Sequence, residues 1–258
     1  MSQTPTLLFI HGAWHSRDCW SSVIPALEKH GYRCLAPQVE FCGSETPVGS
    51  LAGSLSQVQS LIADETRNGR NIVLVNHSFG GAVGCSAVKG FTEKDPSRLD
   101  DDNSGRVIGI IQLCAFMPPS RTSQYDVLRP IIDSGACFHY AGPDGWELCK
   151  SDADLNDLFY NDLPLAVADS WKGRLLKQST GCFTDRENIY AGWMDVPVCY
   201  IVTTQDHAIP VQFQEVLVAA AKKAGASISS KILEAGHSPF LSRVDETVNL
   251  VLEAVGEF

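Results

Sequence analysis

The fold of this chain is decided by one stretch, Ile72-Val73-Leu74-Val75-Asn76-His77-Ser78-Phe79-Gly80-Gly81-Ala82. A short apolar, β-branched run stops abruptly at a serine, and two glycines and an alanine follow. The pattern predicts a buried strand, a sharp turn and a helix packed close to that strand, and it matches G-x-S-x-G except at the first glycine. We call residues 76–80 the elbow. A loop serine before an ordinary buried helix would fit the same residues, so the rest of the chain must decide.

The composition limits the kind of protein. The 258 residues are enough for one large α/β domain with an insertion, or for two small domains. The net charge is −10 and no Lys or Arg cluster occurs, so we expect neither nucleic acid nor an anionic membrane as a partner. The sequence has neither the basic N-terminal region of a signal peptide nor an apolar run long enough to span a membrane. We therefore expect a soluble, cytoplasmic protein. The nine cysteines include no C-x-x-C pair, so we expect reduced thiols and no metal or cofactor.

Strand-like and helix-like segments alternate along the chain. Continuous apolar runs predict strands at 6–10, 32–36, 72–77, 107–114, 198–204 and 229–233. Apolar residues at helical spacing predict helices at 18–30, 51–68, 79–90, 211–224 and 241–255, the first of them capped by Asp18. A polar stretch at 92–105 with the acidic run Asp100-Asp101-Asp102 is expected to be a surface loop. The alternation predicts an α/β fold with about six mostly parallel strands and helices on both faces.

The pattern changes between residues 119 and 195. Apolar residues are dispersed there, continuous strand runs disappear, and short helices are expected at 152–168 and 175–178. We interpret this segment as an inserted, mainly helical cap over the active site. The predicted organisation is a core of residues 1–118 and 196–258, interrupted by a cap of residues 119–195.

Three chemically capable side chains come directly after predicted strands. Ser78, Asp206 and His237 follow the strands at 72–77, 198–204 and 229–233. In a parallel sheet such exits lie at the carboxyl edge, where ligands bind. The chain order Ser, Asp, His is that of the α/β-hydrolase fold.

The sequence resembles the α/β-hydrolase superfamily, and within it the small methylesterase and hydroxynitrile-lyase-like serine hydrolases, including fungal members. Besides the elbow, the resemblance rests on stretches spread over the core, which are Phe9-Ile10-His11-Gly12-Ala13-Trp14, Ala115-Phe116-Met117-Pro118, Asp206 with Pro210, and Gly236-His237-Ser238-Pro239-Phe240. It does not extend to the 119–195 segment. The resemblance implies the α/β-hydrolase fold and a serine-based reaction without a cofactor.

Side-chain chemistry suggests a role for each of these groups. Ser78 would attack a carbonyl carbon, His237 would take its proton and return it to the leaving group, and Asp206 would hold the imidazole tautomer. The N–H of Phe79 would be one oxyanion donor, and the resemblance makes the N–H of Ala13 the other.

Other polar residues are weaker candidates for these roles. His77 adjoins Ser78, but neighbouring side chains in such a turn point apart, so it is a poor base. His11 is expected to order the loop of Ala13. Asp195 precedes a strand, so it would lie at the wrong end of the sheet to replace Asp206.

Several residues are candidates for contact with substrate. They share an aromatic or polar side chain, or a place near the proposed oxyanion donors, and they are Gly12, Trp14, His139, Trp146, Trp171, Trp193 and His207. The tryptophans could equally pack the cap onto the core, His139 could have a packing role, and an exposed position suits His207 better.

Two positions bear on the type of reaction. Hydroxynitrile lyases of this group carry Thr after the first-strand His and Lys after the catalytic His, where this sequence has Gly12 and Ser238. This favours hydrolysis of a carboxylic ester, thioester or lactone of a small apolar or polyketide-like substrate through an acyl-enzyme on Ser78. The alternatives are an acyl-transferring or lactone-forming thioesterase of secondary metabolism, a hydroxynitrile-lyase-like or other C–C lyase or decarboxylase, and a non-catalytic ligand-binding protein. The expected partner is a small molecule, or an acyl chain on a carrier protein, and the oligomeric state stays open.

Overall fold

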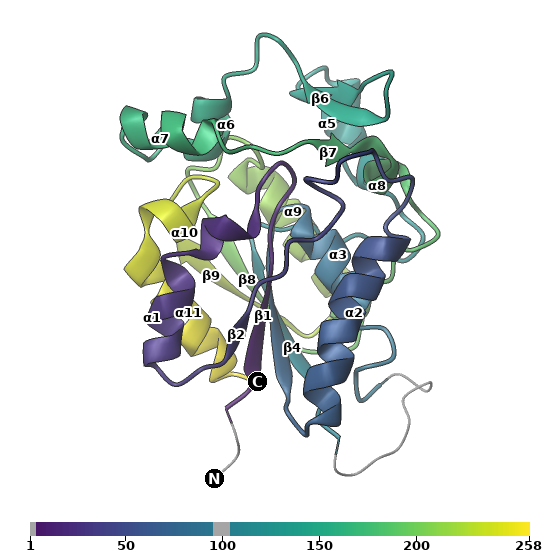
Figure 1. The fold of residues 1–258 in the computed structure, drawn as a ribbon, viewed down its shortest axis with the longest axis vertical. Coiled ribbons are helices and arrows are strands. Elements are labelled where there is room, and N and C mark those ends of the chain that lie inside the picture. Colours follow the sequence, from purple (N-terminus) through teal and green to yellow (C-terminus); the bar gives the residue numbers. More distant parts are fainter. Residues whose placement is uncertain (1–3, 95–103) are drawn as a thin grey trace.

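The computed structural model describes residues 4–94 and 104–258. Its centre is a sheet of six parallel strands in the order β2-β1-β3-β4-β8-β9 (Figure 1). The strands are β1 (Thr6–Ile10), β2 (Cys34–Leu35), β3 (Ile72–His77), β4 (Val107–Leu113), β8 (Val198–Thr203) and β9 (Ile228–Leu233). The predicted number and direction of the strands are confirmed, although β2 has only two residues. The acidic run at residues 100–102 lies outside the described residues.

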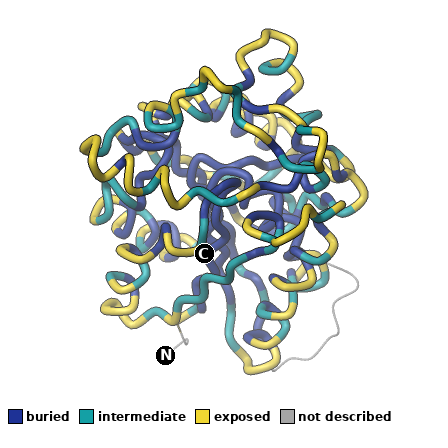
Figure 2. The backbone as a smooth tube through the Cα atoms, turned by 45° about the horizontal axis from the view of Figure 1, so that its top comes forward, coloured by how far each residue is buried: buried dark blue, intermediate teal, exposed yellow. Residues whose placement is uncertain are grey.

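Helices cover both faces of this sheet. The helices α1 (Val23–Lys29) and α11 (Val244–Val255) lie on one face, and α2 (Ala52–Arg67), α3 (Gly80–Ala87) and α9 (Val211–Lys223) lie on the other (Figure 1). Because strand side chains alternate, Leu7 and Phe9 pack toward the first face while Leu8 and Ile10 pack toward the second. The central strands are buried and the outer helix surfaces are exposed (Figure 2).

Two of the predicted core helices are each split in two. The first divides into the 3-10 helix η1 (Arg17–Trp20) and α1, and its capping hydroxyl belongs to Ser16, which accepts a hydrogen bond from the N–H of Asp18 at 3.3 Å. The expected Asp18 cap is therefore wrong. The last helix divides at Arg243 into α10 (Pro239–Ser242) and α11.

The 119–195 segment lies over the carboxyl ends of the core strands (Figure 1). It contains more than helices, because β5, β6 and β7 form a separate three-stranded antiparallel sheet. Its elements are α4 (Gln124–Val127), α5 (Arg129–Asp133), β5 (His139–Ala141), β6 (Trp146–Cys149), α6 (Leu155–Tyr160), α7 (Leu165–Lys172), β7 (Gln178–Ser179), α8 (Thr180–Thr184) and the 3-10 helix η2 (Gly192–Met194).

The helix expected at 175–178 does not form. The N–H of Leu176 donates to the carbonyl of Trp14 at 2.7 Å, the carbonyl of Lys177 accepts from Gly43 at 2.8 Å, and Gln178 pairs with Glu147 in the antiparallel sheet. Backbone groups bonded to distant parts of the chain are not free for helical bonds. The helix expected at 152–168 is divided into α6 and α7, with Pro164 immediately before α7.

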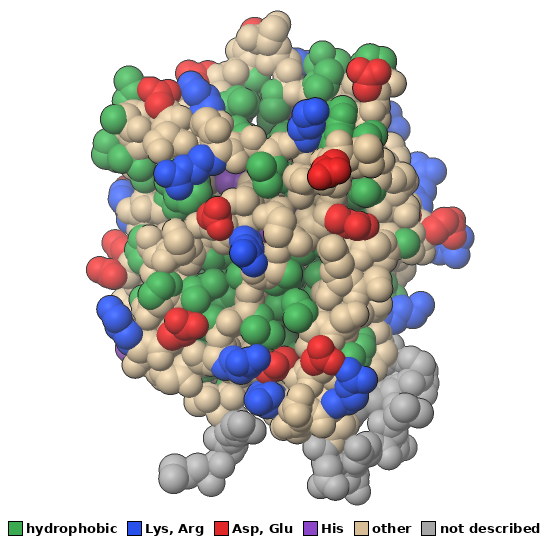
Figure 3. Space-filling view, in the orientation of Figure 1, with side chains coloured by type: hydrophobic (Ala, Val, Ile, Leu, Met, Phe, Trp, Pro, Cys, Tyr) green, Lys and Arg blue, Asp and Glu red, His purple; other side chains and the backbone are tan. Residues whose placement is uncertain are grey.

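The surface is mixed in charge. On the face shown in Figure 3, Lys and Arg side chains are interspersed with Asp and Glu side chains. Among residues 4–94 and 104–258, no helix is both long enough and apolar enough to cross a membrane. All nine cysteines are free thiols, as predicted.

The elbow brings α3 very close to the strands beneath it. A Cβ atom at Gly80 would lie 2.5 Å from the carbonyl oxygen of His11 and 2.6 Å from that of Ile10. A Cβ atom at Gly81 would lie 2.3 Å from the carbonyl oxygen of Phe116. The two glycines therefore allow backbone-to-backbone approach on two sides of the helix N-terminus.

We predict that Gly80→Ala lowers the free energy of unfolding by about 1–3 kcal/mol, because rigid backbone must move to admit the methyl group. Urea denaturation measures the change. Gly49→Ala is the matched control, since nothing lies within 4 Å of a Cβ atom there. Equal stability of the two variants would contradict the close approach at Gly80.

Candidate active site

Ser78 occupies the sharp turn that ends β3. Its φ angle is +52°, an uncommon left-handed conformation for a residue with a side chain. The turn is held by hydrogen bonds from the N–H of Ser78 to the carbonyl of Leu113 at 3.3 Å, and from the N–H groups of Phe116 and Gly81 to the carbonyl of Ser78 at 3.0 Å each. The structure thus fixes the backbone at Ser78 against the end of β4.

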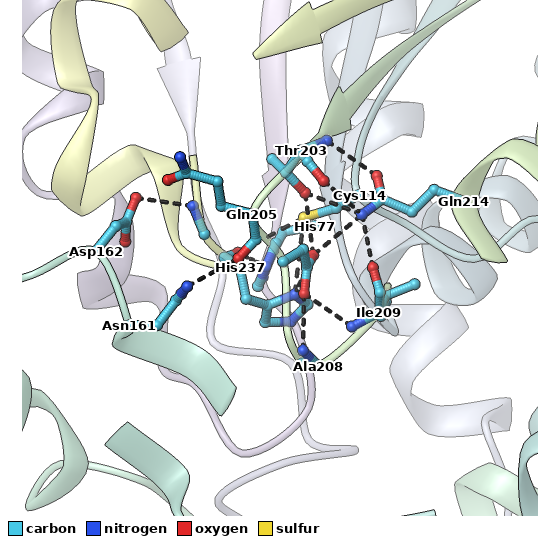
Figure 4. Close-up of polar contacts among 12 residues, drawn as sticks. His77, Cys114, Asn161, Asp162, Thr203, Gln205, Ala208, Ile209, Gln214 and His237 are labelled. Atoms are coloured by element: carbon cyan, nitrogen blue, oxygen red, sulfur yellow. Dashed lines mark hydrogen bonds and ion pairs between the residues drawn. The ribbon is translucent and has the colours of Figure 1, made fainter. Parts of the chain in front are cut away.

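His237 and Asp206 meet at the same edge of the sheet. The Nδ1 atom of His237 lies 2.8 Å from Oδ2 of Asp206, and both side chains are buried (Figure 4). Four further groups donate to the carboxylate at 2.8–3.3 Å, which are the N–H groups of Ala208 and Ile209, the hydroxyl of Thr203 and the side-chain amide of Gln214. A buried carboxylate with five donors is well compensated for the loss of water.

His77 supports the loop of His237. Its Nε2–H donates to the carbonyl oxygen of His237 at 2.9 Å. Burial, together with the neighbouring His237 and His15, lowers the pKa of His77 well below its usual value, so this imidazole is neutral. His77 therefore holds the main chain of His237, as Figure 4 shows.

Two residues that follow α6 form hydrogen bonds with the loops that carry His237 and Asp206. The Asp162 carboxylate accepts from the N–H of Gly236 at 2.8 Å, and the Asn161 amide donates to the carbonyl of Gln205 at 2.8 Å (Figure 4). The Asp162 carboxylate also accepts from the hydroxyl of Ser242 at 2.6 Å. Sequence reasoning missed these residues and Gln214, because no local pattern distinguishes them from ordinary surface polar residues.

The loop after β1 lies against Ser78. A Cβ atom at Gly12 would come within 2.7 Å of Nδ1 of His77 and 3.0 Å of Cβ of Ser78, so only glycine fits there. His11 orders this loop, because its Nδ1–H donates to the Gly12 carbonyl at 3.0 Å and its Nε2 accepts from the N–H of Val39 at 3.1 Å. Burial lowers the pKa of His11 to about 4, which fits a neutral ring.

Two amide groups are left open beside Ser78. Within the described part of the chain, no group accepts a hydrogen bond from the N–H of Ala13 or of Phe79. Both residues line the same cavity as Ser78. These N–H groups are therefore available to a ligand atom.

One cavity joins these parts, and the empty space within it, including the part that opens to solvent, is about 400 Å³. Ser78 and His237 line it, and most of the remaining wall is aromatic or aliphatic. The rest of the lining comes from the core (Ala13, Trp14, Phe79, Phe116, Ala208 and Ile209) and from the 119–195 segment (Gln124, Leu128, Phe138, His139, Phe159 and Phe183). The arrangement can hold an apolar molecule with one polar centre near Ser78.

Other residues expected at the substrate lie elsewhere. Trp193 is buried and donates to the carbonyl of Pro118 at 2.8 Å, Trp146 lies under Lys177 and Trp171 lies under Arg174. His207 is half exposed and pairs with Asp157 at 3.1 Å. None of these four candidates lines the cavity, whereas Trp14 and His139 do.

Three side chains come close enough to be considered for a metal. Candidate ligand atoms of His77, Cys114 and His237 lie within 4.8 Å of one another. The Nε2 of His77 and the Nδ1 of His237 are already hydrogen-bonded within the protein, and burial raises the pKa of the Cys114 thiol well above its usual value. We therefore assign these contacts to the positioning of His237.

The chain was compared with known proteins. The model of the alpha/beta hydrolase family matches residues 7–250. The alpha/beta hydrolase nvfD of Aspergillus novofumigatus is 26% identical over 255 residues, covering 98% of this chain and 97% of that protein. Methylesterase 2 of Arabidopsis thaliana is 27% identical over 233 residues, covering 82% of each chain.

Solved structures show the same fold. The Arabidopsis methylesterase MES16 superposes with a TM-score of 0.75 at 20% identity, covering 98% of this chain and 100% of that one. Tomato Methylketone Synthase I, solved with 2-tridecanone, gives a TM-score of 0.77 at 15% identity with both chains fully covered. The predicted fold is confirmed, and with a family model that spans nearly the whole sequence the chain belongs to the alpha/beta hydrolase family.

Proposed function

We propose that this protein is a serine hydrolase that cleaves a carboxylic ester, thioester or lactone through an acyl-enzyme on Ser78. One observation carries the proposal. Ser78, held at a φ of +52°, lines one cavity together with His237, whose Nδ1 is 2.8 Å from Asp206. Relatives named methylesterases give independent support for an ester as the substrate class.

The proposed reaction has two steps. In the first, the hydroxyl oxygen of Ser78 attacks the carbonyl carbon while His237 takes the proton, and the protonated imidazole then gives it to the leaving alcohol or thiol. In the second, His237 takes a proton from water as the water oxygen attacks the acyl carbon. The bond from that carbon to the oxygen of Ser78 then breaks, the imidazolium returns the proton to Ser78, and the carboxylic acid leaves. Asp206 holds the Nδ1–H tautomer and stabilises the imidazolium, and the four other groups that donate to its carboxylate fix the orientation of that carboxylate.

The negative oxygen of each tetrahedral intermediate needs donors. The open N–H groups of Ala13 and Phe79 supply them in this proposal. Each such donor is typically worth about 3 kcal/mol of transition-state stabilisation. The close packing of Gly12 on Ser78 keeps the Ala13 amide next to the reacting carbonyl.

The cavity wall sets the proposed substrate class. Most lining side chains are apolar, and several come from the 119–195 segment, which we take as the cap. This suits a small apolar or polyketide-like acyl group, free or carried by a thiol. No Lys or Arg is among the residues that line the cavity, so it offers no ammonium to a cyanide leaving group, which disfavours the lyase alternative.

We predict that Ser78→Ala lowers kcat/KM for aryl esters of medium-chain acids by about ten-thousand-fold or more. A fluorophosphonate should add one mass increment to the wild type and none to the variant. Ser54→Ala is the matched control, since its buried hydroxyl on α2 has no hydrogen-bond partner. Full hydrolysis by Ser78→Ala would refute the acyl-enzyme.

Gln214 on α9 supports Asp206 through its side-chain amide. Gln214→Leu removes the amide that accepts from the N–H of Thr203 and donates to Asp206 and to the carbonyl of Ile209. We expect the free energy of unfolding to fall by about 2–3 kcal/mol, because buried polar groups lose their partner. We expect kcat to fall about tenfold with little change in KM. Urea denaturation and steady-state kinetics measure both. Gln212→Leu, an exposed site on the same helix, should change neither quantity.

A further inference from the structure

The cavity contains a second imidazole backed by a buried carboxylate. The Nδ1 atom of His139 lies 2.7 Å from Oε1 of Glu147, and the two side chains are 5% and 0% exposed. The antiparallel register pairs His139 with Cys149 and Ala141 with Glu147, so His139 and Glu147 are diagonal neighbours on one face of the small sheet. The contact is therefore built into the pairing of β5 with β6.

Further contacts fix both members of this pair. The hydroxyl of Tyr125 donates to the Glu147 carboxylate at 2.7 Å, and the indole N–H of Trp14 donates to the main-chain carbonyl of Glu147 at 3.4 Å. The His139 ring is surrounded by the rings of Trp14 at 5.3 Å and Phe183 at 5.4 Å. These contacts fix the orientation of the ring, and a directional hydrogen bond to a ligand needs such a fixed donor.

The arrangement parallels that of His237 with Asp206. In each pair a carboxylate is hydrogen-bonded to Nδ1, so Nε2 is the ring nitrogen that can bind a ligand. Both imidazoles line the same cavity, His237 from the loop after β9 and His139 from the segment above the sheet. Among the other lining side chains, Ser78, Gln124 and the indole of Trp14 carry the only remaining polar groups.

The surroundings of His139 favour its charged form. Burial opposes the charge, but the contacts with Cys137 and Glu147 outweigh it and raise the pKa of His139. A buried carboxylate also needs an opposite charge or strong donors beside it. Glu147, Tyr125 and Cys137 lie beside this ring, and the thiol of Cys137 donates to the His139 carbonyl at 3.4 Å. Other titratable groups nearby are Cys149, the cross-strand partner of His139, and Arg129, Tyr140 and Lys150, which line an adjoining pocket with it.

We propose that His139, held by Glu147, is a specificity-determining residue that donates a hydrogen bond to a second, uncharged carbonyl oxygen of the substrate. This inference rests on the proposed function and adds the substrate class, an ester with a keto group elsewhere on its acyl chain. An imidazolium only donates, and a carbonyl oxygen only accepts, so the two match. A substrate carboxylate would leave a net negative charge beside Glu147 in an apolar cavity, which is unfavourable.

The test compares matched substrates on one enzyme. Aryl esters of straight-chain acids are paired with oxo esters of equal length, with the keto group at successive carbon atoms. At one or more positions the wild type should prefer the oxo ester in kcat/KM by about tenfold or more, the discrimination expected of a charge-assisted hydrogen bond. His139→Phe should bring that ratio close to one, and His139→Gln, which keeps an amide donor, should restore part of it.

The pH dependence separates this role from packing. Since only the imidazolium donates from Nε2, the preference for the oxo ester should decline as pH rises through the raised pKa of His139. The ratio of the two kcat/KM values removes any pH effect that both substrates share. Glu147→Gln and Cys137→Ala should each move the decline to lower pH, because both side chains raise the pKa of His139. Tyr140→Phe, an exposed position next to His139 on β5, is the control for changes in this strand.

Several outcomes would overturn the inference. A ratio near one at every keto position or an unchanged ratio in His139→Phe would each do so. A preference for a hydroxy ester over the oxo ester would do so too, because Nε2 of a neutral His139 would then accept a hydrogen bond from the substrate. If no ester is hydrolysed, the proposed function fails by itself. Calorimetry then tests the hydrogen bond from His139 to a carbonyl oxygen. A methyl ketone must bind the wild type more tightly than its isostere with CH2 in place of oxygen. In His139→Phe that difference in affinity must disappear.

Discussion

The left-handed backbone at Ser78 is the constraint on which the rest of the structure depends. A residue with a side chain adopts this conformation at a cost of about 1–3 kcal/mol, so its neighbours must hold it there. Hydrogen bonds to β4 and to the start of α3 do so, and they require α3 to lie almost in contact with the backbone of β1 and of residue 116. Gly80 and Gly81 make that approach possible, and the hydroxyl of Ser78 is left at the cavity.

The parts that meet at this cavity come from distant regions and are joined by hydrogen bonds. Asp162 holds the loop of His237, and Trp14 is bonded on one side to Leu176 and on the other to Glu147. The segment above the sheet therefore does more than close the cavity. It fixes the loops whose amide groups and imidazole would carry out the proposed reaction, so substitutions in this segment should affect the geometry of the core site.

Histidines of identical chemistry are separated by their surroundings. His11, His15 and His77 are buried with uncharged partners, and burial lowers the pKa of each, to about 4 for His11 and about 3 for His15. His237 and His139 instead have a buried carboxylate at Nδ1. Neutral rings order the backbone here, while carboxylate-backed rings can hold or move a proton. All five rings are buried, so it is the hydrogen-bond partner of each ring that distinguishes the three backbone-ordering histidines from the two with a carboxylate at Nδ1.

The sequence by itself determined the strand-turn-helix at Ser78 and the placing of Asp206 and His237 after parallel strands, because glycine geometry, apolar runs and the common edge of a parallel sheet are local or topological rules. It could not distinguish Trp14 and His139, which line the cavity, from Trp146, Trp171, Trp193 and His207, which do not. That choice depends on the register of β5 with β6 and on hydrogen bonds between residues far apart in the chain. The extended course of residues 175–178 and the support from Gln214 and Asp162 were decided in the same way, since such contacts exist only after the chain has folded.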